Sequence, residues 1–237
     1  MIKGKKHVLL LAAAFLALAF GCCLYVGDYY RAAEESLAAS ENVTVEITGT
    51  KAVFLPEKAE TGLIFYPGGK VEFTAYGPLM NKLAEKNILC VLLKMPLNLA
   101  VLDVNAAEGI PEQYPEVQNW YLAGHSLGGS MAATFAGKNA DAYDGLILLA
   151  AYSTEDLTQT GLKVCSLYGD RDGVLNMEKY TRYRPNLPED TSEWILEDGN
   201  HSGFGNYGHQ EKDGESQLES GAQIQWTADR MMEFILD

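Results

Sequence analysis

Residues 119–131 read Asn-Trp-Tyr-Leu-Ala-Gly-His-Ser-Leu-Gly-Gly-Ser-Met, and this stretch decides the fold. The apolar residues before Gly124 are typical of the end of a buried strand, and good helix formers follow the pair Gly128-Gly129. Between them a serine stands on a turn with glycine two residues before it and two residues after it. Side chains at Gly124 and Gly128 would collide with the neighbouring strand and helix, so the spacing predicts a tight strand-to-helix turn centred on Ser126.

Such a turn strains the serine backbone and holds the Ser126 hydroxyl clear of the sheet. The amide of Leu127, at the start of the helix, faces any oxyanion that forms there. The pattern therefore indicates a nucleophilic serine. The alternative is a glycine-rich turn with an inert serine, so the argument depends on partners elsewhere in the chain.

Strand-like and helix-like segments alternate around this turn. Apolar runs typical of strands lie at 43–48, 52–55, 62–66, 88–93, 121–123, 146–151, 163–168 and 193–196, and helical spacing is found at 73–85, 97–109, 174–183 and 222–236. The alternation predicts a three-layer α/β fold with a mostly parallel central sheet. Only residues 152–162 separate two of the strands after the serine turn, which leaves no room for a lid domain, so we expect an open site.

A serine nucleophile needs a general base, and the chain offers four histidines. His7 precedes the first apolar run, and His125 adjoins Ser126, so its ring should point away from the hydroxyl. His201 lies in a glycine-rich loop at the carboxyl end of a predicted strand, where sheets of this kind place their sites. His209 lies further along a polar loop and is expected to be solvated. His201 is therefore the predicted base.

The acid that orients the base should lie between serine and histidine in the chain. The stretch Gly169-Asp-Arg-Asp-Gly-Val ends a predicted strand, and its spacing favours Asp172 over Asp170, which we expect to serve a turn or a salt bridge. A simple Asx turn before a helix is the alternative. The second oxyanion donor should follow the strand at 62–66, where the Gly69 amide is the first candidate and the Lys70 amide the second.

Composition narrows the possible partners. The chain has 237 residues and a formal net charge of −14, which would repel a phosphate backbone, so we expect no nucleic acid partner. No Cys/His spacing suggests a metal, and no cofactor is expected. Cys90 and Cys165 lie in strand-like runs and should be buried free thiols.

The N-terminus reads as a membrane anchor. Residues 1–7 are basic, and residues 8–26 form a run of 19 uncharged residues that as a helix would span about 28 Å, close to a bilayer core. Lysines precede this run and acidic residues follow it, which predicts a cytoplasmic N-terminus and an extracytoplasmic domain. Gly21-Cys22 also fits a lipoprotein signal, but Ala19-Phe20 suits one poorly, so an uncleaved single-pass anchor is the prediction.

The Ala- and Glu-rich residues 27–41 should form a short helical stalk, with the globular domain over 42–237. The alternative beyond Arg31 is a first helix packed on the domain.

Several stretches together resemble the α/β-hydrolase family. They are Gly-His-Ser-Leu-Gly-Gly at 124–129, Gly-Asp-Arg-Asp-Gly-Val at 169–174 and Gly-Asn-His-Ser-Gly-Phe-Gly at 199–205. The runs at 65–72, 94–100 and 207–214 are similar to a subgroup of small membrane-anchored bacterial hydrolases with a dienelactone-hydrolase-like fold. The resemblance implies a triad of Ser126, Asp172 and His201, with Gly69 and Leu127 as the oxyanion hole. Dienelactone hydrolases have cysteine where this chain has Ser126, so their substrate does not carry over.

From residues and resemblance together we expect a surface-tethered serine hydrolase of carboxylesterase type. It would cleave a small-molecule carboxylic ester or thioester through an acyl-enzyme on Ser126. An acyltransferase using the same intermediate is one alternative, and a non-catalytic binding module on a hydrolase fold is another.

Overall fold

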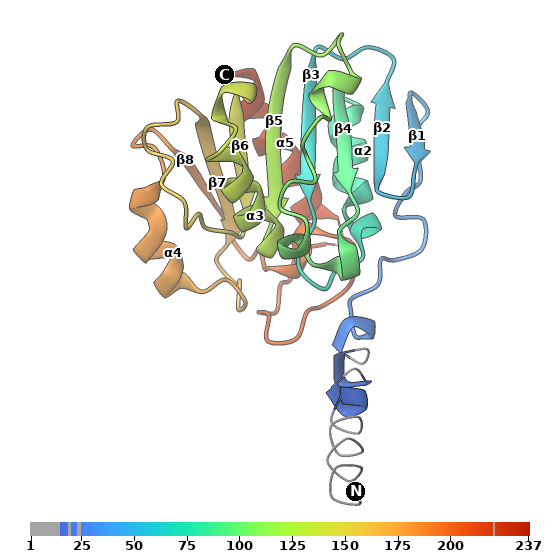
Figure 1. Cartoon of the computed structure of the whole chain (residues 1–237), viewed down its shortest axis with the longest axis vertical. Coiled ribbons are helices and arrows are strands. Elements are labelled where there is room, and N and C mark those ends of the chain that lie inside the picture. Colours follow the sequence, from blue (N-terminus) through green and yellow to red (C-terminus); the bar gives the residue numbers. More distant parts are fainter. Residues whose placement is uncertain (1–14, 19, 23–24, 220) are drawn as a thin grey trace, which may run out of the picture.

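A computed structural model of the chain describes residues 15–18, 20–22, 25–219 and 221–237. Its sheet has eight strands in the order β1-β2-β4-β3-β5-β6-β7-β8 (Figure 1). The strands are β1 (Val43–Ile47), β2 (Lys51–Pro56), β3 (Thr61–Tyr66), β4 (Ile88–Leu93), β5 (Asn119–His125), β6 (Gly145–Leu149), β7 (Lys163–Gly169) and β8 (Ser192–Leu196). The β1–β2 and β2–β4 pairs are antiparallel and the other pairs are parallel, which confirms the predicted mostly parallel sheet.

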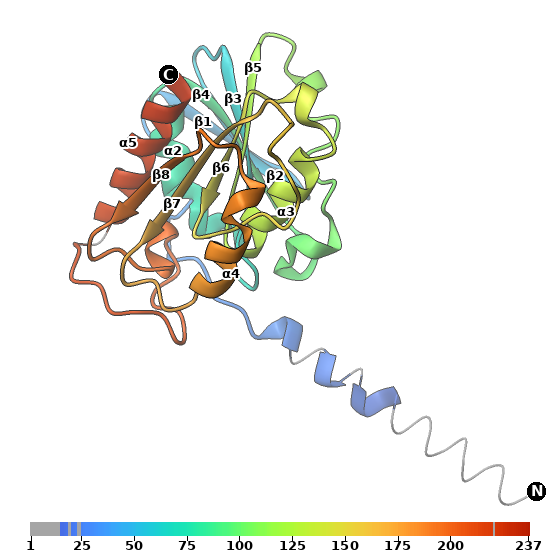
Figure 2. The same cartoon turned by 90° about the vertical axis from the view of Figure 1, so that its left-hand side faces the viewer.

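Helices cover both faces of the sheet, as predicted. The α-helices are α2 (Gly77–Ala84), α3 (Leu127–Ala136), α4 (Met177–Tyr183) and α5 (Ala222–Leu236). Figure 2 shows α2 and α5 on one face and α3 on the other. Along β3, Leu63 and Phe65 belong to the core under α2 and α5, whereas Ile64 and Tyr66 belong to the core under α3. The central strands are therefore continuous apolar runs because both of their faces are buried.

The helix predicted over 97–109 is absent. Two short 3₁₀ turns, η2 (Pro96–Asn98) and η3 (Ala100–Leu102), stand at its start. Leu97 and Asn98 have φ angles of 53° and 57°, and two consecutive left-handed residues interrupt a right-handed helix. The predicted short connection is confirmed, since residues 150–162 between β6 and β7 form neither helix nor strand.

The helical stalk predicted over 27–41 is also wrong. Helical residues end at Gly27, and Tyr30 forms a parallel bridge with Val71 beyond the end of β3. The Tyr30 amide donates to the Lys70 carbonyl at 2.8 Å, and the Ala33 amide donates to the Asn206 carbonyl at 2.8 Å. These two amides bond to the domain rather than to one another, and residues 34–37 form only a turn, so the segment follows the surface of the domain without becoming a helix.

Parts of the N-terminal prediction concern residues that the structure does not describe. The basic residues 1–7 and residues 8–14, 19, 23 and 24 of the apolar run lie outside the described residues. Within the described ranges, no helix combines the length and the apolar character needed to cross a bilayer.

Candidate active site

The serine turn has the geometry that its glycines predict. β5 ends at His125 and α3 begins at Leu127, and Ser126 between them has φ 53° and ψ −123°. A Cβ atom at Gly124 would lie 2.7 Å from the backbone carbonyl carbon of Gly128, and one at Gly128 would lie 2.3 Å from the Pro67 carbonyl oxygen. Only glycine fits either position, so strand, turn and helix pack closely enough to hold the strained serine in place.

His201 and Asp172 form a buried pair. Nδ1 of His201 lies 2.8 Å from Oδ2 of Asp172, and both side chains are 1% exposed. The other carboxylate oxygen accepts the amides of Val174 at 2.9 Å and Leu175 at 2.7 Å, which fixes its direction. A carboxylate accepts only, so Nδ1 carries the donated proton and Nε2 of the neutral ring is left as a proton acceptor.

That Nε2 atom is buried and has no hydrogen-bond partner in the part of the chain that the structure describes. His201 and Ser126 line the same cavity, which has a volume of about 210 Å³. The other lining residues are Leu127, Ser130, Ala150, Ala151, Tyr152, Val174, Leu175 and Asn176. Because contacts between nucleophile and base are often long before substrate binds, a free acceptor on a residue that lines this cavity suits a general base.

The loop after β3 brings Gly69 against the start of α3. A Cβ atom on Gly69 would lie 2.9 Å from Cδ2 of Leu127, so a larger residue would require the Leu127 side chain to shift. The Lys70 amide is already bonded to the Asn98 carbonyl at 2.8 Å, whereas the Gly69 and Leu127 amides form no hydrogen bond within the described ranges. Two free amides beside the serine, one at a helix N-terminus, make a suitable place for an oxyanion.

Asp170 and His209, which the sequence pattern disfavours as triad members, make other contacts. Asp170 accepts the Asp198 amide at 2.7 Å and lies 4.0 Å from Nε of Arg171, whereas His201 is paired with Asp172. His209 is half-exposed, and its Nε2 lies 4.0 Å from a carboxylate oxygen of Glu215. Both serve the surface loops around the site.

Sequence reasoning missed the role of His125. Its ring centre lies 4.4 Å from that of His201, and its Nδ1 lies 2.8 Å from the Tyr76 hydroxyl. That hydroxyl also accepts the Gly68 amide at 3.1 Å. Burial, together with the neighbouring His201, holds the pKa of His125 well below its usual value of 6.5, so the ring stays neutral. The His125 ring thus packs against His201 and connects it, through Tyr76 and Gly68, to the loop that carries Gly69.

Asp213 is the second residue that sequence reasoning missed. One carboxylate oxygen accepts the amides of His201 at 3.0 Å, Gly173 at 3.2 Å and Gly214 at 2.9 Å. The other accepts the amide and the hydroxyl of Ser202, both at 2.7 Å. Partial burial opposes ionisation, but the bonds from Ser202, His201 and Gly173 outweigh it and lower the pKa of Asp213. Its place in the shared run at 207–214 was the only signal in the sequence.

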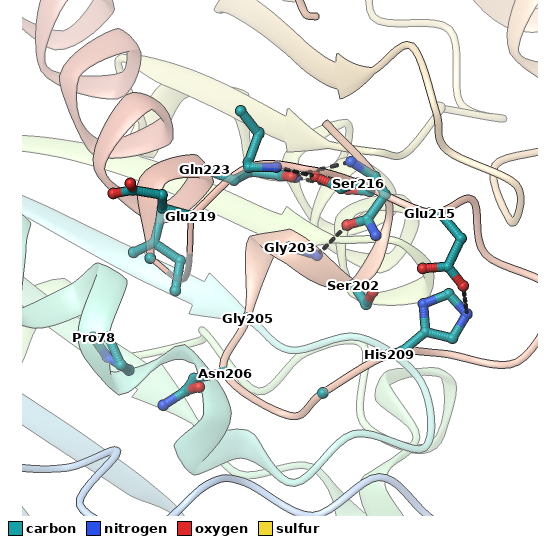
Figure 3. Close-up of a pocket in the computed structure, with 15 residues that line it drawn as sticks. Pro78, Ser202, Gly203, Gly205, Asn206, His209, Glu215, Ser216, Glu219 and Gln223 are labelled. Atoms are coloured by element: carbon teal, nitrogen blue, oxygen red, sulfur yellow. Dashed lines mark hydrogen bonds and ion pairs between the residues drawn. The ribbon is translucent and has the colours of Figure 1, made fainter. Parts of the chain in front are cut away.

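A larger cavity of about 450 Å³ lies behind the His201 loop and does not contain Ser126 (Figure 3). Asn200 and Gln223 are buried at its wall and bond to each other's polar groups, and His209 faces Glu215 across its open side. The buried amides of Asn200 and Gln223 are already paired with each other. Ser126 and His201 line the smaller cavity, which is therefore the candidate active site.

A model described as "Alpha/beta hydrolase family" matches residues 62–225, from β3 into α5. The chain belongs to the α/β hydrolase family. Its matched region contains Ser126, Asp172 and His201, together with both proposed oxyanion donors. A search of the curated proteins gives no match to this α/β hydrolase.

Solved structures share the fold at low sequence identity. TT1662 from Thermus thermophilus aligns with a TM-score of 0.59 and 15% identity over 82% of this chain and 99% of its own. Est1E from Butyrivibrio proteoclasticus gives 0.57 and 15% over 83% and 100%. A membrane phospholipase A, described as a bacterial virulence factor, gives 0.57 and 17% over 96% of both chains. At these identities the likeness establishes the α/β hydrolase fold alone.

Proposed function

We propose that this α/β hydrolase is a serine esterase that cleaves a carboxylic ester or thioester through an acyl-enzyme on Ser126. The observation that carries the proposal is the His201–Asp172 pair, in which Nε2 of His201 has no partner among the described residues and His201 lines the same 210 Å³ cavity as a strained, half-buried serine. An inert serine on a glycine-rich turn would need neither a buried imidazole nor a buried carboxylate beside it.

The steps follow from these positions. Ser126 Oγ attacks the acyl carbon while His201 Nε2 takes its proton, and the oxygen that becomes negative faces the Gly69 and Leu127 amides. The carbon–oxygen or carbon–sulfur bond to the leaving group then breaks, and His201 returns the proton to that group. Water repeats the sequence on the acyl-enzyme and releases the acid. Asp172 holds the imidazole in the tautomer that leaves Nε2 free.

We also propose that residues 8–26 tether the domain to the outer face of the cell membrane. The proposal depends on the length of the apolar run, on the lysines before it and on Asp28, Glu34 and Glu35 after it. One structure of the same fold is named as a membrane phospholipase A, which is compatible with an ester substrate near a membrane.

Turnover of p-nitrophenyl esters of graded chain length by the purified full-length protein tests the reaction. We expect Ser126→Ala and His201→Ala each to lower kcat by about 10⁴-fold or more, because the covalent route needs both groups. Equal turnover by Ser126→Ala would contradict the proposal. Added alcohol or amine acceptors distinguish hydrolysis from acyl transfer by the product that forms.

A further inference from the structure

An exposed apolar surface lies beside the catalytic opening. It consists of Leu97, Val101 and Leu102, whose side chains are 55%, 53% and 54% exposed. The segment that carries them, residues 95–102, contains no charged residue in a chain of net charge −14. We call these three side chains the apolar rim. Exposed large apolar side chains that gather in one short segment mark a contact surface more often than scattered ones do.

The apolar rim is joined to the candidate oxyanion hole. η3, which carries Val101 and Leu102, packs against α3, and α3 begins at Leu127. The Asn98 carbonyl accepts the Lys70 amide next to Gly69. The two left-handed residues Leu97 and Asn98 turn the chain sharply at this point, and backbone strain of this kind is common where a surface serves a function.

The N-terminal segment reaches the domain at the same place. Lys70 Nζ lies 2.8 Å from the Asp28 carboxylate and 4.6 Å from the centre of the Tyr25 ring. The Tyr30 backbone bonds to Lys70 on one side and to Glu72 on the other, both at 2.8 Å. In Figures 1 and 2 the segment leaves the domain on the side toward which the parallel strands point. One residue, Lys70, thus contacts both the end of the proposed anchor and the segment that carries the apolar rim.

We propose that the apolar rim rests on the lipid bilayer and that the enzyme takes its ester from that bilayer. This inference rests on the proposed function. Only residues 27–29 separate the proposed anchor from Tyr30. Even if these residues are fully extended, Tyr30, which bonds to Lys70 and Glu72, lies within about 14 Å of the anchor's last residue. A domain held so closely cannot turn its catalytic edge away without breaking the Tyr30 contacts. The acidic character of the whole chain favours a zwitterionic lipid face over an anionic one.

The size of the cavity narrows the substrate class. About 210 Å³ is smaller than the roughly 300–1,000 Å³ of pockets that hold drug-sized ligands, which suits an acyl group of a few carbons rather than a long chain. Leu127, Ala150 and Val174 line part of this cavity, and polar residues such as Ser130 and Asn176 line the rest. The substrate is therefore a short-chain acyl ester of a membrane-embedded amphiphile. Water is consumed, the ester carbon–oxygen bond breaks, the short acid leaves into water and the amphiphilic alcohol stays in the bilayer.

The experiment uses the full-length protein in phosphatidylcholine vesicles and two butanoyl esters of one fluorophore. One ester is water-soluble, and the other is held in the bilayer by a hexadecyl chain. The test variant Leu97→Gln/Val101→Gln/Leu102→Gln removes the apolar rim. Leu236→Gln is the matched control, because Leu236 is 76% exposed at the end of α5 beside the chain's C-terminus, on the opposite side of the domain in Figure 1.

We expect the triple variant to lose at least tenfold in the rate on the bilayer-held ester and to stay within twofold of the wild type on the soluble one. The control should match the wild type on both. Equal rates of the triple variant and wild type on the bilayer-held ester would overturn the inference while leaving the esterase intact. If sedimentation shows that the triple variant has a different oligomeric state, and its rate on the bilayer-held ester is not selectively reduced, the inference is overturned and the apolar rim contacts a second copy of the chain. Failure of the wild type on both esters would count against the proposed function itself.

Discussion

Asp213 should matter for catalysis although it lies outside the triad. Its carboxylate joins the residue after Asp172 to the backbone of His201, through the amides of Gly173 and His201, and the Ser202 contacts complete the cluster. In Asp213→Asn the side-chain amide oxygen can still accept the backbone amides of His201, Gly173 and Gly214. The new NH₂ group then faces the Ser202 amide, and two donors cannot bond to each other.

The cost follows from these contacts. One unpaired donor costs about 1–3 kcal/mol, and the retained bonds weaken because the acceptor loses its charge. Since Asp213 is only partly buried, we expect about 3 kcal/mol less free energy of unfolding in urea. We expect kcat to fall by about 10- to 100-fold with KM within threefold, because the base and its acid are no longer held together.

The assay measures kcat and KM on a soluble ester at a temperature where urea titration shows both proteins fully folded. Asp141→Asn is the control, since Asp141 is exposed and forms no side-chain hydrogen bond among the described residues. A kcat within twofold of the wild type, together with a stability loss below about 1 kcal/mol, would refute the positioning role.

Three further predictions concern neighbouring residues. Asp172→Asn should lower kcat by about 10⁴-fold through the wrong imidazole tautomer, while Asp170→Asn should stay within tenfold; the reverse order would exchange their roles. His125→Gln should remove a pH dependence of stability, because below pH 6.5 His125 binds a proton in the unfolded chain but not in the folded one. On acidification the wild type should therefore lose up to about 1.4 kcal/mol more of its free energy of unfolding per pH unit than the variant. Parallel curves of unfolding free energy against pH, from urea titrations, would contradict this. Tyr30→Ala keeps the backbone bonds to Lys70 and Glu72 but removes the ring that packs against Tyr207 and the hydroxyl that accepts the Glu211 amide at 2.9 Å. It should lower kcat on a soluble ester severalfold by loosening Tyr30 against the loop that carries Gly69, and an unchanged kcat with lowered stability would mean that the contact is only structural.

The sequence predicted most of the fold because the signals were local. Buried parallel strands such as β4 are continuous apolar runs, and Ser126 and Asp172 follow two of them, β5 and β7. His201 follows the half-buried edge strand β8. The helix predicted over 97–109 failed because nothing in the apolar pattern marks Leu97 and Asn98 as left-handed. Propensity alone favoured a helix there.

The remaining misses depend on long-range contacts. The Ala- and Glu-rich segment after Gly27 favours a helix locally, but its amides bond to loops about 40 and 170 residues away. His125 acquires its place through Tyr76, 49 residues earlier. Asp213 accepts hydrogen bonds from the backbone amides of Gly173, His201 and Gly214, which lie at three separate places in the chain. Contacts of this kind become visible only once the sheet has brought its loops to one edge.

The central claim is that His201 activates Ser126 as a nucleophile, and labelling by a fluorophosphonate tests it most directly. Intact-mass measurement of the full-length protein should show one covalent adduct, and peptide mapping should place it on Ser126. Ser126→Ala should show no adduct, and His201→Ala should label at least 100-fold more slowly, since a serine hydroxyl without its base is a weak nucleophile. An adduct on another serine, or undiminished labelling of Ser126→Ala, would contradict the account.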